Sequence, residues 1–265
     1  MVYLTDGKPD DPMSIPTVIV TGAAKRLGRT IAEQFFTRGC NLVLHYNHSA
    51  QEAKALANKF IMQRENSCAV VGCDLEQDNV AQQIIDIALE KFGHIDYLIN
   101  NASVFYPTPV EKASNDMMKS ILKINWRQPE KLALAARPYL AEQQGAIVNL
   151  IDIYAEAGLS EHTFYVAAKA ALLESSRMMA RAFAPRVRVN CVSPGAILWP
   201  EQKEDNPSDK NEPVDKIKQK ILDNSALKRL GSPADIASTA TFLAMDASYM
   251  TGCNIRVDGG RRLYL

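Results

Sequence analysis

Long apolar runs and paired cysteines are both missing from this chain of 265 residues. No stretch holds the ~18 apolar residues of a membrane span, and the opening residues lack the basic start and apolar run of a secretion signal. We therefore expect no membrane contact, a cytoplasmic location and a loose N-terminal arm over residues 1–15. The five cysteines form no CxxC pair and no metal-ligand spacing. This pattern predicts reduced thiols, packed as small hydrophobes, and no metal site.

An excess of charge of either sign is also missing, since 30 Lys and Arg residues balance 30 Asp and Glu residues. That balance gives no general electrostatic case for a nucleic acid or an anionic membrane as partner. A phosphate-bearing cofactor would have to be held by a local group of residues. The apolar fraction of 47% and the charged fraction of 23% are typical of a globular protein.

From residue 17 onward, short β-branched runs alternate with longer segments whose apolar residues recur every three or four positions. Seven strands are predicted, at 17–21, 41–46, 67–72, 97–102, 146–151, 187–192 and 253–257. Helical periodicity is clearest over 29–39, 81–93 and 164–183. This alternation predicts an α/β fold with a parallel sheet covered by helices on both faces, in one domain over 16–265. Residues 199–216, rich in charge and proline, are a linker or a loop over the substrate. Only about fifty residues follow this segment, which favours the loop.

A glycine-containing loop follows the first strand and opens a helix, in the segment TGAAKRLGRTIAE. Gly22 and Gly28 let the backbone bend and approach a phosphate, and the free N–H groups of a helix start attract negative charge. Two glycines alone are a weak signal, but their position between a buried strand and an amphipathic helix strengthens it. The loop therefore predicts a dinucleotide site.

The end of the second strand, HYNHSA, lacks the acidic residue that commonly binds the adenosine ribose of NADH. Arg26, with Asn47, His48 and Ser49, could instead donate hydrogen bonds to a 2′-phosphate, so we expect NADPH. The alternative is that Asn47 and His48 are solvated turn residues. Asp74, after the third strand, either accepts a hydrogen bond from the adenine or caps the next helix.

Five motifs occur in order: the glycine loop, NNAS at 100–103, Asn125, Tyr165-x-x-x-Lys169 and ProGly at 194–195. With them the chain resembles the short-chain dehydrogenase/reductase family from about residue 16 to its end. The resemblance implies a Rossmann-type fold of seven parallel strands, usually as a homotetramer. It also implies that Tyr165 exchanges a proton with the substrate, that Lys169 supports it, and that Asn125 holds a water.

Tyr165 and Lys169 are four residues apart and so share one face of a helix. A nearby ammonium favours phenolate, so we expect the pKa of Tyr165 to fall from about 10 toward neutrality. Lys169 could also bind the nicotinamide ribose. A Tyr and a Lys at this spacing are common in helices, so the pair alone says little.

Asp152 departs from the family pattern, which has Ser thirteen residues before the Tyr. A carboxylate beside a nascent alkoxide would repel it, which argues against simple ketone reduction. A carboxyl group at position 152 suits instead a substrate with a ring C=N bond whose nitrogen takes up a proton. Ser103 and Phe105 add a hydrogen-bonding group and a flat face for a planar heterocycle, although Phe105 could be ordinary core.

These features resemble the pteridine reductase branch of the family. This resemblance implies that NADPH transfers a hydride to a pterin ring carbon and that Tyr165 supplies a proton.

Other positions depart from that branch or stay open. The residues that bind the 2′-phosphate in better-known members are replaced here by Asn47 and His48. Leu198 and Trp199 would line the substrate side or simply pack. His162, one turn before Tyr165, is a further substrate contact or a surface residue, and Arg261 and Arg262 either reach a neighbouring subunit's site or are solvated.

The expected site follows from these arguments. Catalytic residues are expected to be Asp152, Tyr165, Lys169 and Asn125. Cofactor contacts are expected from Gly22, Lys25, Arg26, Leu27, Gly28, His45, Tyr46, Asn47, His48, Ser49, Asp74, Leu75, Asn101, Ala102, Ser103, Tyr165, Lys169, Pro194 and Gly195. Substrate contacts are expected from Arg26, Ser103, Phe105, Asp152, Tyr165, Leu198 and Trp199. The expected substrate is a pterin or folate; a carbonyl or 3-oxoacyl-thioester substrate and a non-catalytic NADPH sensor are the alternatives.

Overall fold

Seven strands form one parallel sheet in the part of the chain that the computed structural model describes, residues 15–197 and 214–265. The strands are β1 (Thr17–Val20), β2 (Asn41–Tyr46), β3 (Cys68–Gly72), β4 (Tyr97–Asn100), β5 (Ala146–Leu150), β6 (Arg188–Pro194) and β7 (Asn254–Val257). Their order across the sheet is β3-β2-β1-β4-β5-β6-β7, and every neighbouring pair is parallel. This is the Rossmann-type, doubly wound order in a single domain.

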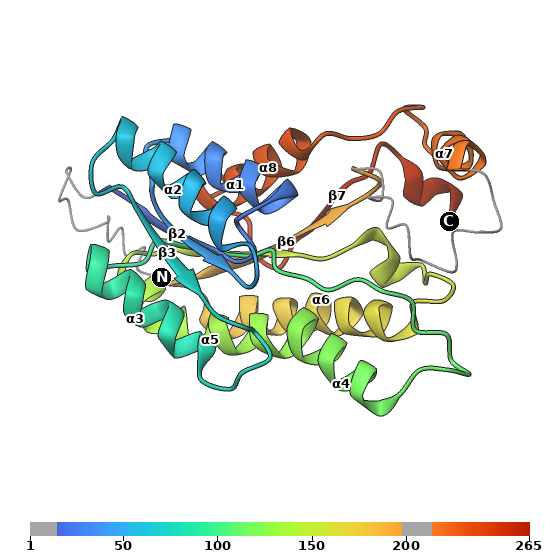
Figure 1. Cartoon of the computed structure of the whole chain (residues 1–265), viewed down its shortest axis with the longest axis horizontal. Coiled ribbons are helices and arrows are strands. Elements are labelled where there is room, and N and C mark those ends of the chain that lie inside the picture. Colours follow the sequence, from blue (N-terminus) through green and yellow to red (C-terminus); the bar gives the residue numbers. More distant parts are fainter. Residues whose placement is uncertain (1–14, 198–213) are drawn as a thin grey trace, which may run out of the picture.

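Helices cover both faces of the sheet (Figure 1). They are α1 (Arg26–Thr37), α2 (Ala50–Gln63), α3 (Val80–Phe92), α4 (Asn115–Leu122), α5 (Gln128–Glu142), α6 (Thr163–Phe183), α7 (Val214–Asp223) and α8 (Pro233–Thr241). Short helical turns are η1 (Lys123–Arg127), η2 (Ile153–Glu156), η4 (Phe242–Asp246) and η5 (Arg261–Tyr264). Helices α1, α2 and α8 lie on one face, and α3, α5 and α6 on the other.

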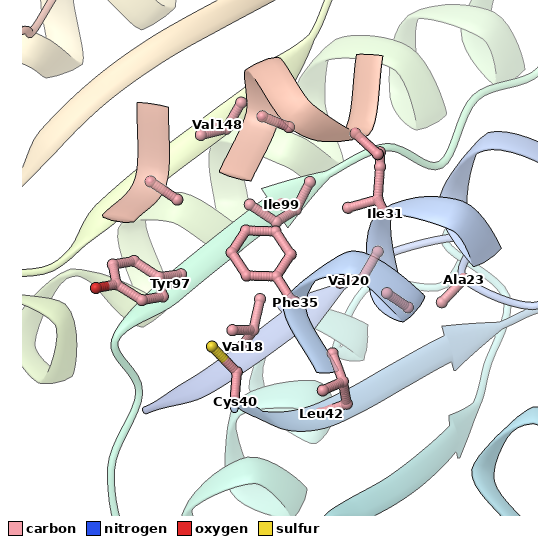
Figure 2. Packing of buried hydrophobic residues seen from close by; sticks show 14 of the residues in the cluster. Val18, Val20, Ala23, Ile31, Phe35, Cys40, Leu42, Tyr97, Ile99 and Val148 are labelled. Carbon is pink, nitrogen blue, oxygen red and sulfur yellow. The ribbon is translucent and has the colours of Figure 1, made fainter. Parts of the chain in front are cut away.

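The core has two apolar layers because the central strands are buried on both faces. All residues of β1, β4 and β5 are buried. Figure 2 shows the layer under α1, where Phe35 packs beside Val18 and Ile99, and its ring centroid lies 6.2 Å from that of Tyr97. Each fully buried side chain of this size contributes roughly 1.5–3 kcal/mol to folding. This rigid double core fixes the strand ends from which the site is built.

The strand and helix pattern expected from the sequence is confirmed, with corrections at element ends. Thr21, Asn101 and Ile151 lie just beyond their strands rather than within them, and β6 continues to Pro194. The expected loop at 199–216 is wrong in its last three residues, because α7 begins at Val214. The N-terminal arm over residues 1–14, Leu198, Trp199 and the rest of that segment lie outside the described residues.

The cysteines are free, and three of them, Cys40, Cys68 and Cys191, are buried. Burial raises the pKa of the Cys40 and Cys68 thiols to about 12, so these two thiols stay protonated. Among the described residues no group of His, Cys, Asp and Glu is arranged to hold a metal ion. No helix within those ranges is long and apolar enough to cross a bilayer.

The strand order reverses between β1 and β4, the neighbours at the centre of the sheet. In sheets of this kind the connections from the two strands leave in opposite directions and open a crevice beyond their carboxyl ends. The glycine loop follows β1 and the NNAS motif follows β4, so the fold places both at this crevice.

Candidate active site

The glycine loop packs tightly against the segment after β4. A Cβ added to Gly28 would lie 2.1 Å from the carbonyl oxygen of Gly22, so only glycine fits there. Gly22 itself has a φ of +64°. Asn101 joins the two segments, because its Nδ2 donates to the carbonyl oxygens of Thr21, at 2.8 Å, and Gly22, at 3.2 Å. The glycines are therefore required by backbone geometry at the crevice.

Arg26 begins α1 in a left-handed conformation, with a φ of +50°. This region costs a non-glycine residue about 1 kcal/mol or more, and such residues cluster at functional sites. The side chain is exposed and borders the crevice. The neighbouring Lys25 is paired with Glu52 at 2.7 Å, so of the two cations Arg26 is the one more available to a phosphate.

A groove of about 330 Å³ lies at the crevice. Its lining residues are Gly22, Lys25, Arg26, Leu27, Gly28, His45, Asn47, Asp74, Leu75, Asn101, Ala102, Ser103, Val104 and Ile124. Val104 and Ile124 were not anticipated from the sequence, since an apolar side chain carries no chemical mark of a cofactor contact. Of the expected cofactor residues, the groove lining does not include Tyr46, His48, Ser49, Tyr165, Lys169, Pro194 and Gly195.

Three of the expected cofactor residues have other partners. His45 is buried, its Nδ1 accepts from the Gly22 N–H at 3.2 Å, and its Nε2 contacts the carbonyl oxygen of Cys73 at 3.0 Å. Burial lowers its pKa, so the neutral ring holds the glycine loop in place. Asp74 does not cap α3, whose N-cap is Asn79, and instead accepts from the Glu76 N–H at 2.9 Å. The Tyr46 ring covers Gly72.

These features fit a nicotinamide dinucleotide. The first N–H groups of α1, at Arg26, Leu27 and Gly28, precede its first helical hydrogen bond and are free to bind phosphate. The groove extends from the strand ends near Asn47 and Asp74, past Gly22 and Gly28, to Ser103. Such a groove would hold the adenosine end near β2 and β3 and the nicotinamide end near Ser103.

Asp152, Tyr165 and Lys169 come together at the carboxyl end of β5. The Tyr165 hydroxyl donates to Oδ2 of Asp152 at 2.8 Å, and the Tyr154 N–H donates to Oδ1 at 2.9 Å. Lys169 is 3% exposed, and its Nζ donates to the carbonyl oxygen of Leu150 at 2.8 Å. That Nζ lies 5.9 Å from the centroid of the Tyr165 ring.

The expected low pKa of Tyr165 is wrong for this site. Burial, and then the charge and hydrogen-bond acceptance of Asp152, raise the pKa of Tyr165 well above its ordinary value, although contact with Ser103 acts in the opposite direction. Burial also raises the pKa of Asp152 and lowers that of Lys169 to about 8. Burial is the larger cause, and the carboxyl group, which the usual Ser would not supply, adds to it. The site therefore keeps Tyr165 as a neutral phenol.

Asn125 fixes the loop that carries Ser103. Its Oδ1 accepts from the Ser103 hydroxyl at 2.6 Å and from the Val104 N–H at 3.1 Å, and its Nδ2 donates to the Val104 carbonyl at 2.9 Å. Asn125 sits in η1, a π-helical turn between α4 and α5, a type of turn frequent at functional sites. The bound water expected at Asn125 stays a prediction.

Comparison with known proteins identifies this arrangement. The family model described as enoyl-(acyl carrier protein) reductase matches residues 22–262. The 3-oxoacyl-(acyl-carrier-protein) reductase FabG of Staphylococcus aureus strain N315 is 31% identical over 248 residues, which are 92% of this chain and 97% of that protein. The L-fucose dehydrogenase of Mus musculus is 29% identical over 248 residues, covering 93% of this chain and 88% of that protein. A crystal structure of a short-chain dehydrogenase/reductase, titled glucose/ribitol dehydrogenase, from Brucella melitensis has a TM-score of 0.81. It is 30% identical and covers 93% of this chain and 96% of that one.

The chain belongs to the short-chain dehydrogenase/reductase family. It is accordingly an oxidoreductase of a family that uses nicotinamide cofactors. None of these named relatives is a pteridine reductase, and the Staphylococcus aureus protein corresponds to the thioester-reductase alternative stated above.

Beside Tyr165 in this short-chain dehydrogenase/reductase, Phe105 and His162 form an aromatic stack. Their ring centroids are 4.3 Å apart with an interplanar angle of 11°, and the Phe105 ring meets Tyr165 edge-on at 4.8 Å. Phe105 is 57% exposed, so the reading as ordinary core is wrong. One face of its ring is covered by His162, which leaves the rest of the ring for a flat substrate. His162 thus contacts the expected substrate residue.

The C-terminal arginines of this short-chain dehydrogenase/reductase turn back onto their own chain. Nη2 of Arg261 donates to the Tyr154 hydroxyl at 2.8 Å, and Nη2 of Arg262 donates to the Glu156 carbonyl at 3.0 Å. Both side chains are partly buried. The expectation that they are merely solvated is therefore wrong.

Proposed function

We propose that this chain is an NADPH-dependent reductase of flat nitrogen-containing rings of the pterin or folate class. The observation that carries the proposal is the 2.8 Å hydrogen bond between the Tyr165 hydroxyl and the Asp152 carboxyl. At position 152 a Ser would donate to a carbonyl oxygen, whereas a carboxylate only accepts. In a ring with a C=N bond, the negative charge that develops on the nitrogen during hydride transfer is cancelled by a proton. Such a substrate suits the Asp152–Tyr165 pair better than a ketone, whose reduction produces an alkoxide.

The raised pKa values of Tyr165 and Asp152 support a two-step proton relay. The Tyr165 hydroxyl gives its proton to the ring nitrogen, and the Asp152 carboxylate then takes a proton from solvent and passes it to the Tyr165 oxygen. Asp152 ends as a carboxylate, which the nearby Lys169 ammonium stabilises. The phenol is thus restored, and its hydroxyl again donates to the carboxylate before the next turnover.

The cofactor supplies the hydride when bound. The choice of NADPH rests on exposed Arg26 and Asn47 at the groove and on the lack of an acidic residue at the end of β2. Arg26→Ala should raise KM for NADPH by about tenfold and leave KM for NADH within about twofold, as measured by cofactor oxidation. An equal effect on both cofactors would remove Arg26 from 2′-phosphate recognition.

A second candidate is a carbonyl or 3-oxoacyl-thioester reductase, in which Asp152 simply replaces Ser. The similarity to the Staphylococcus aureus 3-oxoacyl-(acyl-carrier-protein) reductase favours this reading, while the chemistry of Asp152 favours the first. A third candidate, a non-catalytic NADPH sensor, is disfavoured because Tyr165 and Lys169 are both kept in the site.

Turnover separates these candidates. NADPH oxidation is followed with biopterin, 7,8-dihydrobiopterin, dihydromonapterin and dihydrofolate, and in parallel with acetoacetyl thioesters and simple ketones. The proposal expects turnover of at least one pterin or folate, inhibition by methotrexate, and thioester turnover at least ~100-fold lower. Thioester turnover without pterin turnover would establish the second candidate. NADPH binding without any oxidation would establish the third.

A cytoplasmic location and a homotetramer complete the proposal. The free cysteines support the location, and the homotetramer is the assembly that the family resemblance implies. Light scattering of the purified protein tests the assembly, with a mass of about four times 29.3 kDa as the expected result. A monomer mass would reject it.

A further inference from the structure

The C-terminal turn η5 lies against η2, the turn that follows Asp152. Arg261 is the main link, since its Nη2 donates to the Tyr154 hydroxyl at 2.8 Å and its guanidinium carbon lies 6.0 Å from the centroid of the Tyr154 ring. Its Nη1 also reaches the Ile221 carbonyl of α7 at 3.5 Å. Figure 1 shows η5, at the red end of the chain, beside α7.

Tyr154 connects this arginine to the proposed proton relay. Its backbone N–H donates to Oδ1 of Asp152 at 2.9 Å, which leaves Oδ2 to accept from Tyr165. Asp152 is the N-cap of η2, so the position of the Tyr154 N–H helps to fix the orientation of the carboxyl group. Arg261 holds the other end of the same tyrosine.

We propose that Arg261 is a positioning residue of the active site: it anchors Tyr154, whose N–H orients Asp152. This inference rests on the proposed function of Asp152 as a proton relay. It places the closing residues of the chain in control of how readily the carboxyl group releases and regains its proton.

The groups that face Asp152 act in opposite directions. Burial raises its pKa, whereas the Tyr154 N–H, the Tyr165 hydroxyl and the charges of Lys169 and Arg261 lower it. Lys169 approaches from α6 and Arg261 from η5, so the two cations come from different elements. Loss of the Arg261 charge should therefore shift the carboxyl group further toward its neutral form.

Arg262 offers a matched control in the same turn. Its guanidinium donates to the carbonyl oxygens of Glu156, at 3.0 Å, and Leu265, at 3.4 Å, and it has no bond to Tyr154. Arg261→Met and Arg262→Met remove the same charge from adjacent positions. A general effect of net charge or of loosening the C-terminus would appear in both variants, and an effect specific to Asp152 only in the first.

The test is a carbon-13 NMR titration of the full-length protein with labelled aspartate carboxyl groups. The Asp152 signal is assigned by its loss in Asp152→Asn. Arg261→Met should raise the pKa of Asp152 by about 0.5 to 1, Arg261→Lys should change it by less than about 0.3, and Arg262→Met should leave it within about 0.2 of wild type. The acidic limb of the kcat profile with a turned-over substrate should move by the same amount. Circular dichroism confirms that each variant is folded.

An unchanged pKa of Asp152 in folded Arg261→Met, or equal shifts in the two methionine variants, would overturn the inference. If Arg261→Met does not fold, Arg261→Gln takes its place with the same expectation. The titration uses no substrate, so it is independent of which compound is reduced. Failure of the proposed function would appear instead as absent pterin turnover in the wild-type enzyme.

Discussion

Replacement of Asp152 by Ser should exchange one substrate class for another. The carboxylate oxygen lies 2.8 Å from the Tyr165 hydroxyl, so a substrate oxygen bonded to the far side of that hydroxyl would be about 5 Å from the carboxylate. At an effective dielectric of about 20, two unit charges at that distance repel by roughly 3 kcal/mol, or about 100-fold in rate. Asp152→Ser removes this repulsion and adds a hydroxyl donor.

The assay compares kcat/KM for 7,8-dihydrobiopterin, biopterin and an acetoacetyl thioester, using NADPH oxidation. Asp152→Ser should raise thioester reduction by about 100-fold and lower biopterin reduction by at least tenfold. Asp152→Asn is the control, because it removes the charge at nearly constant shape without supplying a hydroxyl; it should lose biopterin reduction and gain less on the thioester. Unchanged values for both substrates in Asp152→Ser would refute the reasoning.

Three further predictions test other parts of the structure. Tyr165→Phe should lower turnover of an oxidised pterin by ~100-fold or more and leave NADPH affinity nearly unchanged by fluorescence titration; surviving turnover would mean a different proton donor. Gly28→Ala should abolish NADPH binding and cost at least ~3 kcal/mol in urea unfolding, because the added Cβ meets the Gly22 carbonyl at 2.1 Å. Gly39→Ala is the control, because Gly39 has a φ of +89° but open space around it. This variant should lose only about 1 kcal/mol of folding stability and keep NADPH binding. Equal losses of stability in the two alanine variants would contradict the close packing at Gly28. Lys169 has a pKa of about 8 in the folded protein and 10.5 in the unfolded chain, so the unfolded chain binds more protons between these pH values. The free energy of unfolding of the wild type should therefore rise over that range by about 3 kcal/mol relative to Lys169→Met. A difference that does not change with pH would mean that the ammonium is less buried.

The sheet and the glycine loop could be predicted because local patterns determine them. β-branched runs such as Thr17–Val20 are buried on both faces, and this leaves a continuous apolar signature. The four-residue spacing of Tyr165 and Lys169 becomes a shared face as soon as α6 forms. The close approach of Gly22 and Gly28 follows from a strand, a tight turn and a helix in immediate succession.

Other features depend on contacts between distant segments, which no local pattern contains. The stack of Phe105 on His162 exists because a bridge between Thr108 and His162 joins two loops. The partners of His45 are set by where the glycine loop and β3 end in space. Arg261 bonds to Tyr154 although the two residues lie 107 positions apart in the sequence.

The low pKa that the sequence predicts for Tyr165 is wrong for a related reason. Sequence spacing reveals that Lys169 is near, but it does not reveal how deeply the phenol is buried or that it bonds to Asp152. Burial and the carboxyl group both favour the neutral phenol. Electrostatic balance of this kind depends on three-dimensional distances and solvent exposure.

A crystal structure of the enzyme with NADP⁺ and methotrexate would examine the pairing of Asp152 and Tyr165 at the substrate itself. The flat ring should lie against the open part of the Phe105 ring, with a ring nitrogen within 3.2 Å of the Tyr165 hydroxyl and that hydroxyl still bonded to Asp152. A ring bound elsewhere, or an Asp152 carboxyl turned away from Tyr165 in that complex, would contradict the account.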